Sequence, residues 1–212
     1  MATPHGRPGR LVAFEGIDGA GKSTLIAAVA DALAATGVDV RTTREPTDGP
    51  WGRKIRQSAQ TGRLAVEEEL RLFELDRREH VATRLLPWLD EGATVLIDRY
   101  FFSSAAYQGA RGLDAQAILA HHRTFAPEPD LLLVLDLDVD ASLARVGQRG
   151  AIDAFESREL LAKSRSLFLA FGGTVLDAKQ ATATLVPQVI AAITAIGIDD
   201  RSRPVAGRAP EP

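Results

Sequence analysis

Gly16-Ile17-Asp18-Gly19-Ala20-Gly21-Lys22-Ser23-Thr24 is the stretch that decides how this chain folds. It fits the spacing G-x-x-x-x-G-K-[ST], and it lies between a short apolar run and an amphipathic segment. Glycines let the backbone curl so that successive N–H groups point inward at phosphate oxygens, and the following helix adds its positive dipole end. We therefore predict a phosphate-binding loop (P-loop), with Lys22 on the β- and γ-phosphates of a nucleotide and Ser23 on Mg²⁺.

Short apolar runs and longer amphipathic stretches alternate on both sides of this loop. Predicted strands occupy residues 11–15, 38–43, 94–97, 131–137 and 174–176. Predicted helices occupy residues 22–35, 66–90, 115–124, 157–170 and 184–196. Such alternation is typical of a parallel sheet with helices on both faces. The predicted fold class is α/β, a five-stranded parallel sheet sandwiched by helices, in which ligands bind beyond the carboxyl ends of the strands.

The composition restricts the class of protein further. Of 212 residues, 45% are hydrophobic and 25% are charged, which fits one ordinary globular domain, here residues 11–198. The polar, Pro-containing ends, residues 1–10 and 199–212, are predicted to be disordered. There is no cysteine, which excludes disulfides and cysteine-ligated zinc.

Charge and hydropathy bear on partners and location. The net charge of -3 argues against a nucleic-acid partner, which needs a basic face. No apolar run approaches the roughly 20 residues that cross a bilayer. The first ten residues lack the apolar core of a secretory signal. We expect a cytoplasmic protein with no nucleic acid and no membrane as partner.

An acidic residue and an arginine end the third predicted strand, in Val95-Leu96-Ile97-Asp98-Arg99. A carboxylate at this edge of the sheet, beside a P-loop, is placed to hold Mg²⁺ through water. The neighbouring guanidinium offers a rigid fork of donors for phosphate oxygens. The alternative is a structural ion pair between Asp98 and Arg99.

Two helical faces carry side chains that suit a nucleoside. If the segment after Arg99 is helical, Ser104, Tyr107 and Gln108 share one face, so a hydroxyl, a phenol and an amide converge. Phe73 and Arg77 are also four residues apart, and offer a ring to stack on a base with a cation beside it. The alternative is a core phenylalanine and a solvated arginine.

At this point the chain resembles the thymidylate kinase (dTMP kinase) family of P-loop nucleoside monophosphate kinases. The resemblance covers most of residues 11–193. Its strongest parts are residues 14–24, Thr43-Arg44-Glu45-Pro46, and Asp98-Arg99-Tyr100 through Ala106-Tyr107-Gln108-Gly109. It implies in-line transfer of the γ-phosphoryl group of ATP to dTMP in the presence of Mg²⁺, giving dTDP and ADP. It also implies that the chain forms a homodimer.

The resemblance implies a role for each residue at the base and the sugar. The aromatic ring of Phe73 stacks on thymine, and Arg77 bonds a thymine carbonyl. Ser104 and Gln108 complete the recognition of the base. Tyr107 lies against the deoxyribose and disfavours a 2′-hydroxyl.

The phosphate side of the site is implied in the same way. Arg56 and Arg99 grip the acceptor phosphate, Asp18 reaches toward the sugar 3′-hydroxyl, and Glu45 belongs to the same dTMP-binding set. ATP contacts the whole P-loop, which comprises Gly16, Ile17, Asp18, Gly19, Ala20, Gly21, Lys22, Ser23 and Thr24. The metal ligands are Ser23 and Asp98, and the catalytic residues on this side are Lys22 and Arg99.

The conformation of the loop around Glu45 can also be predicted from its residues. The Glu45-Pro46 bond lies in a tight, ligand-facing loop and is a candidate cis peptide, although trans is the more common form of an X-Pro bond. Residues 47–53 are predicted to continue as a loop before a short helix that carries Arg56.

Residues 147–157 are Gly-flanked, charged and placed between helices, which is typical of a lid that closes over the phosphate donor. One lid style of the family has an arginine in the P-loop after the aspartate, but this chain has Gly19 there. The lid is therefore expected to supply the catalytic arginine. The candidates, in order, are Arg149, Arg145, Arg158 and Arg165. Ala154 stands where bacterial relatives often carry arginine, and an ordinary surface loop is the alternative.

Two other functions remain open from the sequence. The nearer is a kinase for another nucleoside monophosphate or for a deoxynucleoside. The more distant is a P-loop switch or an ATP-driven binding module. GTPase switches need an Asn/Thr-Lys-x-Asp loop to read guanine, and no such motif follows the fourth predicted strand.

Overall fold

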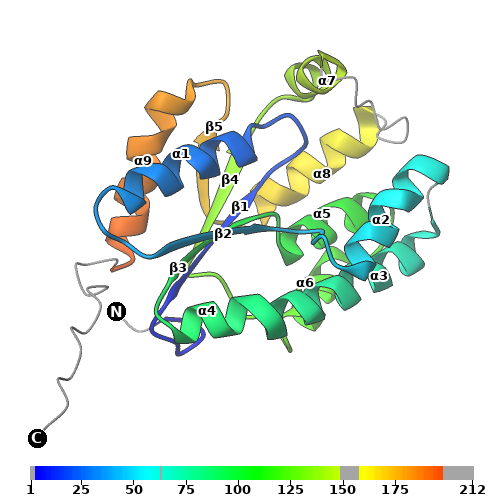
Figure 1. Ribbon diagram of the computed structural model, residues 1–212. Coiled ribbons are helices and arrows are strands. Elements are labelled where there is room, and N and C mark those ends of the chain that lie inside the picture. Colours follow the sequence, from blue (N-terminus) through cyan, green and yellow to red (C-terminus); the bar gives the residue numbers. More distant parts are fainter. Residues whose placement is uncertain (1–2, 63, 149–157, 198–212) are drawn as a thin grey trace, which may run out of the picture.

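The computed structural model describes residues 3–62, 64–148 and 158–197 (Figure 1). Its five strands form one sheet in the order β2-β3-β1-β4-β5, and every neighbouring pair is parallel. The strands are β1 (Arg10–Glu15), β2 (Val40–Arg44), β3 (Thr94–Asp98), β4 (Leu131–Asp136) and β5 (Thr174–Asp177). The α/β class and the five-stranded parallel sheet are confirmed.

The central strand β1 shows why the strands are apolar at successive positions. Successive side chains of a strand leave on opposite faces of the sheet. Leu11 and Ala13 therefore join one buried hydrophobic cluster, while Val12 and Phe14 join another, and all four are fully buried. Because both faces are covered, no polar residue is needed at alternate positions.

Helices cover the two faces unequally. The face of Val12 packs against α1 (Lys22–Ala34) and α9 (Thr182–Ala195). The face of Leu11 packs against more helices, namely α4 (Leu86–Asp90), α5 (Phe101–Ala110), α6 (Ala115–His122) and α8 (Arg158–Ala170). Beyond this second layer lie α2 (Pro50–Thr61) and α3 (Val66–His80), side by side, and α7 (Val139–Gln148) follows β4 (Figure 1). No described helix is long and apolar enough to span a membrane.

The single helix predicted over residues 66–90 is wrong in one respect. The segment is helical throughout, but α3 and α4 are joined by a π-helical turn, η1 (Val81–Leu85). The Leu86 N–H donates to the carbonyl of Val81, five residues back. Pro87 has no N–H, and its ring would meet the carbonyl four residues earlier in a regular α-helix. The wider turn before Pro87 is consistent with that constraint.

Two local predictions are also corrected. Residues 47–53 are not all loop, because α2 begins at Pro50, a residue suited to the first helical position. Residues 3–10 are ordered: His5 Nε2 hydrogen-bonds Asp130 Oδ2 at 2.9 Å, and the Gly9 N–H donates to Leu89 O at 2.8 Å. These partners are distant in sequence, so composition alone could not reveal them. Residues 199–212 lie outside the described residues.

The first turn of α2 packs closely on the loop before it. A Cβ built on Gly52 would lie 1.9 Å from the carbonyl oxygen of Thr47, whereas one built on Gly147 in α7 would meet nothing within 4 Å. We expect Gly52→Ala to lower the free energy of unfolding by about 1–3 kcal/mol, as overpacking does. Gly147→Ala should leave it unchanged or raise it by up to about 1 kcal/mol. Urea unfolding measures both, and equal midpoints would contradict the close packing of α2.

Candidate active site

The P-loop follows β1 directly and has the curled backbone that its glycines predict. Gly16, Gly19 and Gly21 have φ values of 134°, 76° and 89°, a region that side chains disfavour. A Cβ on Gly16 would also lie 2.4 Å from the carbonyl oxygen of Leu135. Only glycine therefore fits at the point where the chain leaves the sheet.

Lys22 begins α1 and is buried inside the loop. Its Nζ donates to the carbonyls of Gly16 at 2.9 Å and Ile17 at 3.1 Å. Burial and the nearby charge of Arg99 lower the pKa of Lys22 to about 8. An anionic phosphate would be a stronger acceptor than either carbonyl, and it would favour the charged ammonium.

Ser23 and Asp98 meet where α1 begins and β3 ends. The Ser23 hydroxyl donates to Asp98 Oδ2 at 2.5 Å. Arg99 pairs with Asp18, and among the described residues no Asp98–Arg99 ion pair is found, so that alternative is not observed. Within the described residues there is no group of three or more His, Cys, Asp or Glu able to hold a metal. One hydroxyl and one carboxylate fit Mg²⁺, which keeps waters and binds substrate phosphates beside few protein oxygens.

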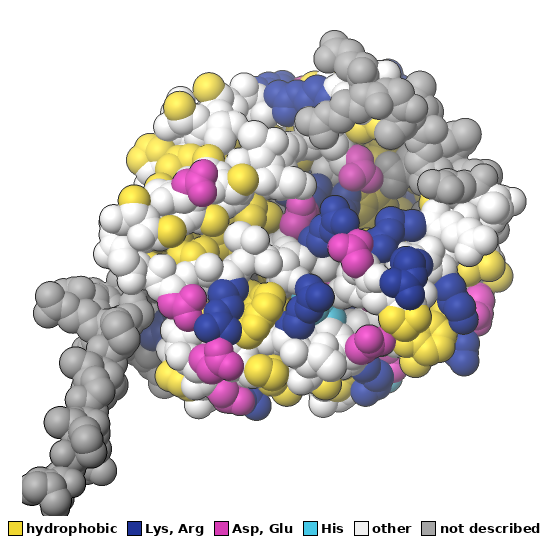
Figure 2. Space-filling view, viewed as in Figure 1, with side chains coloured by type: hydrophobic (Ala, Val, Ile, Leu, Met, Phe, Trp, Pro, Cys, Tyr) yellow, Lys and Arg dark blue, Asp and Glu magenta, His cyan; other side chains and the backbone are white. Residues whose placement is uncertain are grey.

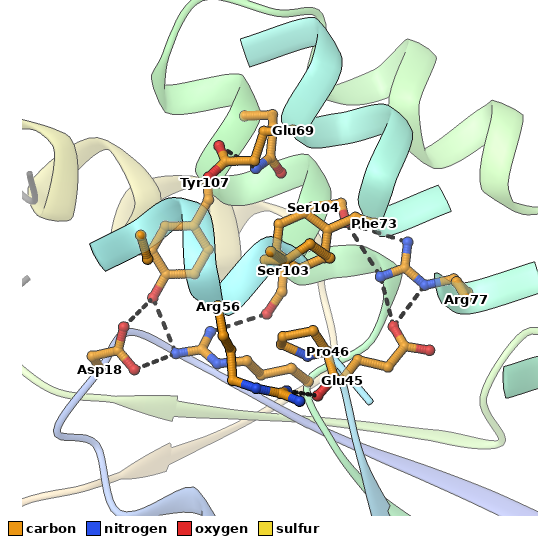
Figure 3. Close-up of a pocket in the computed structure, with 14 residues that line it drawn as sticks. Asp18, Glu45, Pro46, Arg56, Glu69, Phe73, Arg77, Ser103, Ser104 and Tyr107 are labelled. Atoms are coloured by element: carbon orange, nitrogen blue, oxygen red, sulfur yellow. Dashed lines mark hydrogen bonds and ion pairs between the residues drawn. The ribbon is translucent and has the colours of Figure 1, made fainter. Parts of the chain in front are cut away.

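A cavity of about 330 Å³ lies between the P-loop, α2, α3 and α5 (Figure 3). Basic side chains gather around a hollow on the face seen in Figure 2, with acidic side chains among them. The cavity is lined by Asp18, Glu45, Pro46, Ile55, Arg56, Ala59, Glu69, Phe73, Arg77, Arg99, Ser103, Ser104, Tyr107 and Gln108. All nine residues predicted to bind dTMP are among them. Phe73 is only partly buried and lies outside both hydrophobic clusters of the described residues, so it is not a core phenylalanine.

One end of the cavity is built around Arg99. Its guanidinium donates to Asp18 Oδ1 at 2.5 Å and to the hydroxyl of Tyr107 at 3.3 Å. Burial raises the pKa of Asp18, but the charges of Arg99 and Lys22 outweigh it and hold the pKa below its usual value. Arg99 has a φ of 66°, the one positive value among described non-glycine residues. Such a conformation costs free energy and is concentrated at functional sites.

Arg56 reaches the same end of the cavity from α2. Its Nη1 donates to the carbonyl of Pro46 at 3.0 Å, and its Nη2 to Asp48 Oδ1 at 3.0 Å. The Glu45-Pro46 bond is cis, the less common of the two forms considered for it.

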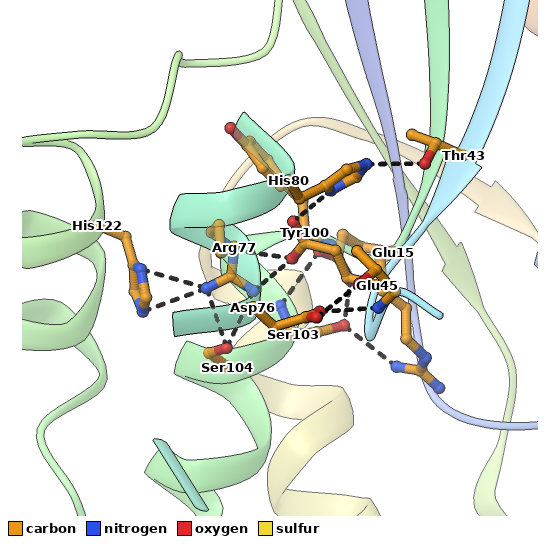
Figure 4. A network of polar contacts seen from close by, with 12 residues as sticks. Glu15, Thr43, Glu45, Asp76, Arg77, His80, Tyr100, Ser103, Ser104 and His122 are labelled. Atoms are coloured by element: carbon orange, nitrogen blue, oxygen red, sulfur yellow. Dashed lines mark hydrogen bonds and ion pairs between the residues drawn. The ribbon is translucent and has the colours of Figure 1, made fainter. Parts of the chain in front are cut away.

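Glu15 is a residue of this region that sequence reasoning missed. It is fully buried at the end of β1, and its Oε1 accepts from the backbone N–H groups of Tyr100 at 2.8 Å and Ser103 at 3.1 Å. Its Oε2 accepts from the Ser103 hydroxyl at 2.6 Å (Figure 4). That hydroxyl in turn accepts from Arg99 Nη1 at 3.1 Å. Burial raises the pKa of Glu15 to about 7, although Ser103 and Arg99 oppose the shift. The available signal was a carboxylate ending an otherwise apolar strand.

The other end of the cavity is built around Arg77, which is 1% exposed. Its Nε donates to Glu45 Oε2 at 2.8 Å, its Nη1 and Nη2 lie 3.2 Å from the Ser104 hydroxyl, and its Nη1 lies 3.2 Å from the His122 ring (Figure 4). Burial and the charge of Arg77 lower the pKa of His122 to about 2. The neutral ring can therefore accept a hydrogen bond from Arg77.

The second oxygen of Glu45 is also occupied. Its Oε1 hydrogen-bonds His80 Nδ1 at 3.0 Å, and His80 Nε2 hydrogen-bonds Thr43 at 2.8 Å (Figure 4). Glu45 thus contacts Arg77 and His80, and it orients the arginine rather than presenting a free carboxylate. His80 and His122 were also missed, because they meet Glu45 and Arg77 only through the fold.

Gln108 and Glu69 form a third polar contact of the cavity. Gln108 Nε2 donates to Glu69 Oε2 at 3.3 Å. Gln108 Oε1 is the one buried side-chain nitrogen or oxygen of the described chain that lacks a hydrogen-bond partner. Such an atom is costly to leave unpaired, and points to a ligand that donates to it.

The four candidates for the lid arginine lie in different surroundings. Arg149, the first candidate, lies outside the described residues, as does most of the predicted lid. Arg145 donates to the carbonyls of Gly19 and Ala178, each at 3.2 Å, and so braces the P-loop. Arg158 pairs with Asp140, and Arg165 pairs with Asp136 at 2.6 Å. Neither arginine lines the cavity.

Comparisons with known proteins agree with this geometry. Residues 14–186 match the family model described as Thymidylate kinase. A thymidylate kinase of Akkermansia muciniphila is 52% identical over 162 residues, 76% of this chain and 79% of that protein. A thymidylate kinase of Xanthomonas campestris pv. campestris is 46% identical over 199 residues, 92% of this chain and 87% of that protein. One of Xanthomonas euvesicatoria pv. vesicatoria is 47% identical over 88% of this chain and 84% of its own.

The raised pKa of Glu15 makes stability depend on pH. The folded chain keeps the Glu15 proton up to pH about 7, whereas the unfolded chain loses it near pH 4.5. The contribution of Glu15 is therefore greatest below pH 4.5 and falls as the pH rises toward 7. Glu15→Gln keeps an acceptor for the two N–H groups but cannot titrate.

We expect the free energy of unfolding of the wild type, measured relative to Glu15→Gln, to fall between pH 4.5 and 7. Urea unfolding across this range measures it, with the exposed Glu67→Gln as the matched control. A difference that stays constant with pH would contradict the protonated, buried Glu15.

Proposed function

The chain belongs to the thymidylate kinase family, and we propose that it transfers the γ-phosphoryl group of ATP to dTMP, giving dTDP and ADP. The observation that carries the choice of acceptor is the polarity of one end of the cavity. There a buried cation, Arg77 on α3, and a buried unpaired acceptor, Gln108 Oε1 on α5, both border the same space.

This pair complements the edge of thymine. Thymine presents a carbonyl at position 4 beside a ring N–H at position 3, which match the Arg77 guanidinium and Gln108 Oε1. Cytosine presents the reverse, an amino donor beside a ring nitrogen that accepts. It would set donor against donor and acceptor against acceptor, leaving buried polar groups unpaired. The ring of Phe73 supplies a face on which the base stacks.

The opposite end of the cavity suits the sugar and phosphate of dTMP. Arg99 and Arg56 are the cations for the acceptor phosphate, and Tyr107 borders the space for the deoxyribose. Asp18 is placed for the 3′-hydroxyl, since its carboxylate lies beside Arg99 and Tyr107. Arg99, Asp18 and Tyr107 also contact one another, which holds these side chains in position.

The donor side uses the P-loop. Its backbone N–H groups and Lys22 bind the phosphates of ATP, and Ser23 and Asp98 would hold Mg²⁺. When bound, Mg²⁺ neutralises charge on the phosphates and orients them.

An oxygen of the dTMP phosphate forms the new bond to the γ-phosphorus, and the bond from that phosphorus to the bridging oxygen of ADP breaks. The electron pair of the broken bond leaves with ADP. The attacking oxygen is already anionic, so the protein needs no strong base. Lys22, Arg99 and the lid arginine, for which Arg149 is our first candidate, offset the charge and align the two substrates.

Assembly and location follow from the family resemblance alone. We propose a homodimer in the cytoplasm. Light scattering after size exclusion would measure twice the mass of one chain, and a monomer at micromolar concentration would contradict the dimer.

The experiment for the acceptor is an ADP-release assay with dTMP, dUMP, dCMP, dGMP and dAMP. We expect the highest kcat/KM for dTMP and a low value for dCMP. Arg77→Lys keeps a charge for the buried Glu45 but loses the fork, so the KM for dTMP should rise about tenfold, near 1.4 kcal/mol. The KM for ATP should be unchanged. A similar rise in both KM values would mean that Arg77 does not face the acceptor.

Tyr107 generates a second prediction, on the sugar. The ring borders the cavity, its hydroxyl contacts Arg99 and Asp18, and its edge packs on Phe168 at 5.8 Å between centroids. Because the ring limits the space beside the sugar, ribothymidine monophosphate should be a poor acceptor. Tyr107→Ala should narrow the gap in kcat/KM between deoxy and ribo acceptors and lower activity on dTMP. Tyr107→Phe, which keeps the bulk, should retain most of the gap. An unchanged ratio in the Ala variant would remove Tyr107 from sugar selection.

A further inference from the structure

Glu69 is a buried carboxylate of the cavity to which the proposed reaction gives no role. It lies on the first turn of α3, its side chain is 9% exposed, and it borders the same space as Arg77 and Phe73 (Figure 3). Oε2 of Glu69 accepts from Gln108 Nε2 at 3.3 Å and from the Arg111 guanidinium. Arg111, at the end of α5, also donates to the carbonyl of Leu64 at 2.9 Å.

The chemistry of this contact fixes the direction of an amide. A glutamine side chain has one end that donates and one that accepts, and the two ends have nearly the same shape. An ionised carboxylate only accepts, so it holds the NH₂ end of Gln108. The same oxygen of Glu69 also forms an ion pair with Arg111. The oxygen end of Gln108 is thereby left without a partner.

We propose that Glu69, held by Arg111, is a positioning residue that sets which end of the Gln108 amide meets the base, and so makes the pocket select a base with a ring N–H. This inference rests on the proposed function. Selectivity against cytosine then has two sources, the Arg77 cation and the fixed acceptor of Gln108. The second is controlled by a carboxylate that need not touch the substrate.

The test replaces the carboxylate by its neutral isostere. In Glu69→Gln the new side chain can donate as well as accept, so Gln108 can reverse and offer its NH₂ to the ligand. We expect the KM for dTMP to rise about tenfold, as for one lost hydrogen bond in a buried site. The kcat/KM for dCMP relative to dTMP should rise by about the same factor. The kcat at saturating dTMP and the KM for ATP should stay within about twofold of the wild type. Glu67→Gln, a neighbouring exposed carboxylate on the same helix, is the matched control and should change neither ratio.

A double-mutant cycle separates positioning from a structural role. Gln108→Leu has no amide to orient, so adding Glu69→Gln to it should not alter the ratio of dCMP to dTMP. If Glu69→Gln changes that ratio equally with Leu at position 108, Glu69 acts on the base or on the fold directly and the proposal is overturned. An unchanged ratio in Glu69→Gln alone would also overturn it. Failure of the wild type to phosphorylate dTMP would instead refute the proposed function.

Discussion

The buried carboxyl group of Glu15 fixes the position of the P-loop relative to helix α5, and the rest of the site depends on this arrangement. It ends β1, immediately before the P-loop, and it accepts from backbone N–H groups at the start of α5. The first N–H groups of a helix have no partner within the helix, and a buried oxygen that accepts from them avoids the cost of leaving them unpaired. One side chain therefore joins the strand that leads to the phosphate-donor loop to the helix that carries Ser104, Tyr107 and Gln108.

The hydrogen bonds of Glu15 continue to the end of the cavity that we propose for the phosphate. Ser103 links Glu15 to Arg99, and Arg99 contacts Asp18 of the P-loop. Arg99 could not adopt a φ of 66° at low cost by itself, so surrounding bonds must hold it there. Its backbone N–H donates to Phe14 O at 3.0 Å, which fixes the turn from β3 to α5 against β1. The strained arginine and the buried glutamate are thus parts of one arrangement.

The sequence predicted the fold for physical reasons, whereas several of the residues that line the cavity were named only through the family resemblance. Apolar runs of strand length alternate with helical periods, and a P-loop can lie only between a strand and a helix, so the parallel sheet followed. Residues of one helix face, such as Phe73 with Arg77, share a cavity because their spacing puts them on one side of α3. The nine predicted dTMP-binding residues come from loops and helices that the parallel sheet brings to the same edge.

What the sequence did not predict are partners set by tertiary packing. His122 reaches Arg77 across 45 residues of sequence, and Glu69 reaches Gln108 across 39 residues, and neither spacing has a helical or strand period. The π-helical turn and the ordered segment around His5 also depend on local crowding or distant contacts that composition does not encode.

Each cation proposed to meet a phosphate has hydrogen-bond partners within the protein. Lys22 donates to two carbonyls of its own loop, Arg99 to Asp18, and Arg56 to Pro46 and Asp48. Burying the charges of Lys22 and Arg99 without partners would be costly, and these hydrogen bonds reduce that cost. A multiply charged phosphate attracts a guanidinium or an ammonium more strongly than a backbone carbonyl does. We expect substrate binding to exchange these hydrogen bonds for stronger ones to phosphate oxygens. The end proposed for the base differs, because Arg77 is paired with the buried Glu45 at 2.7 Å and its Nη groups also contact Ser104 and His122. We therefore expect the end proposed for the phosphates to exchange its hydrogen bonds when a substrate binds, and the end proposed for the base to keep its contacts with Glu45.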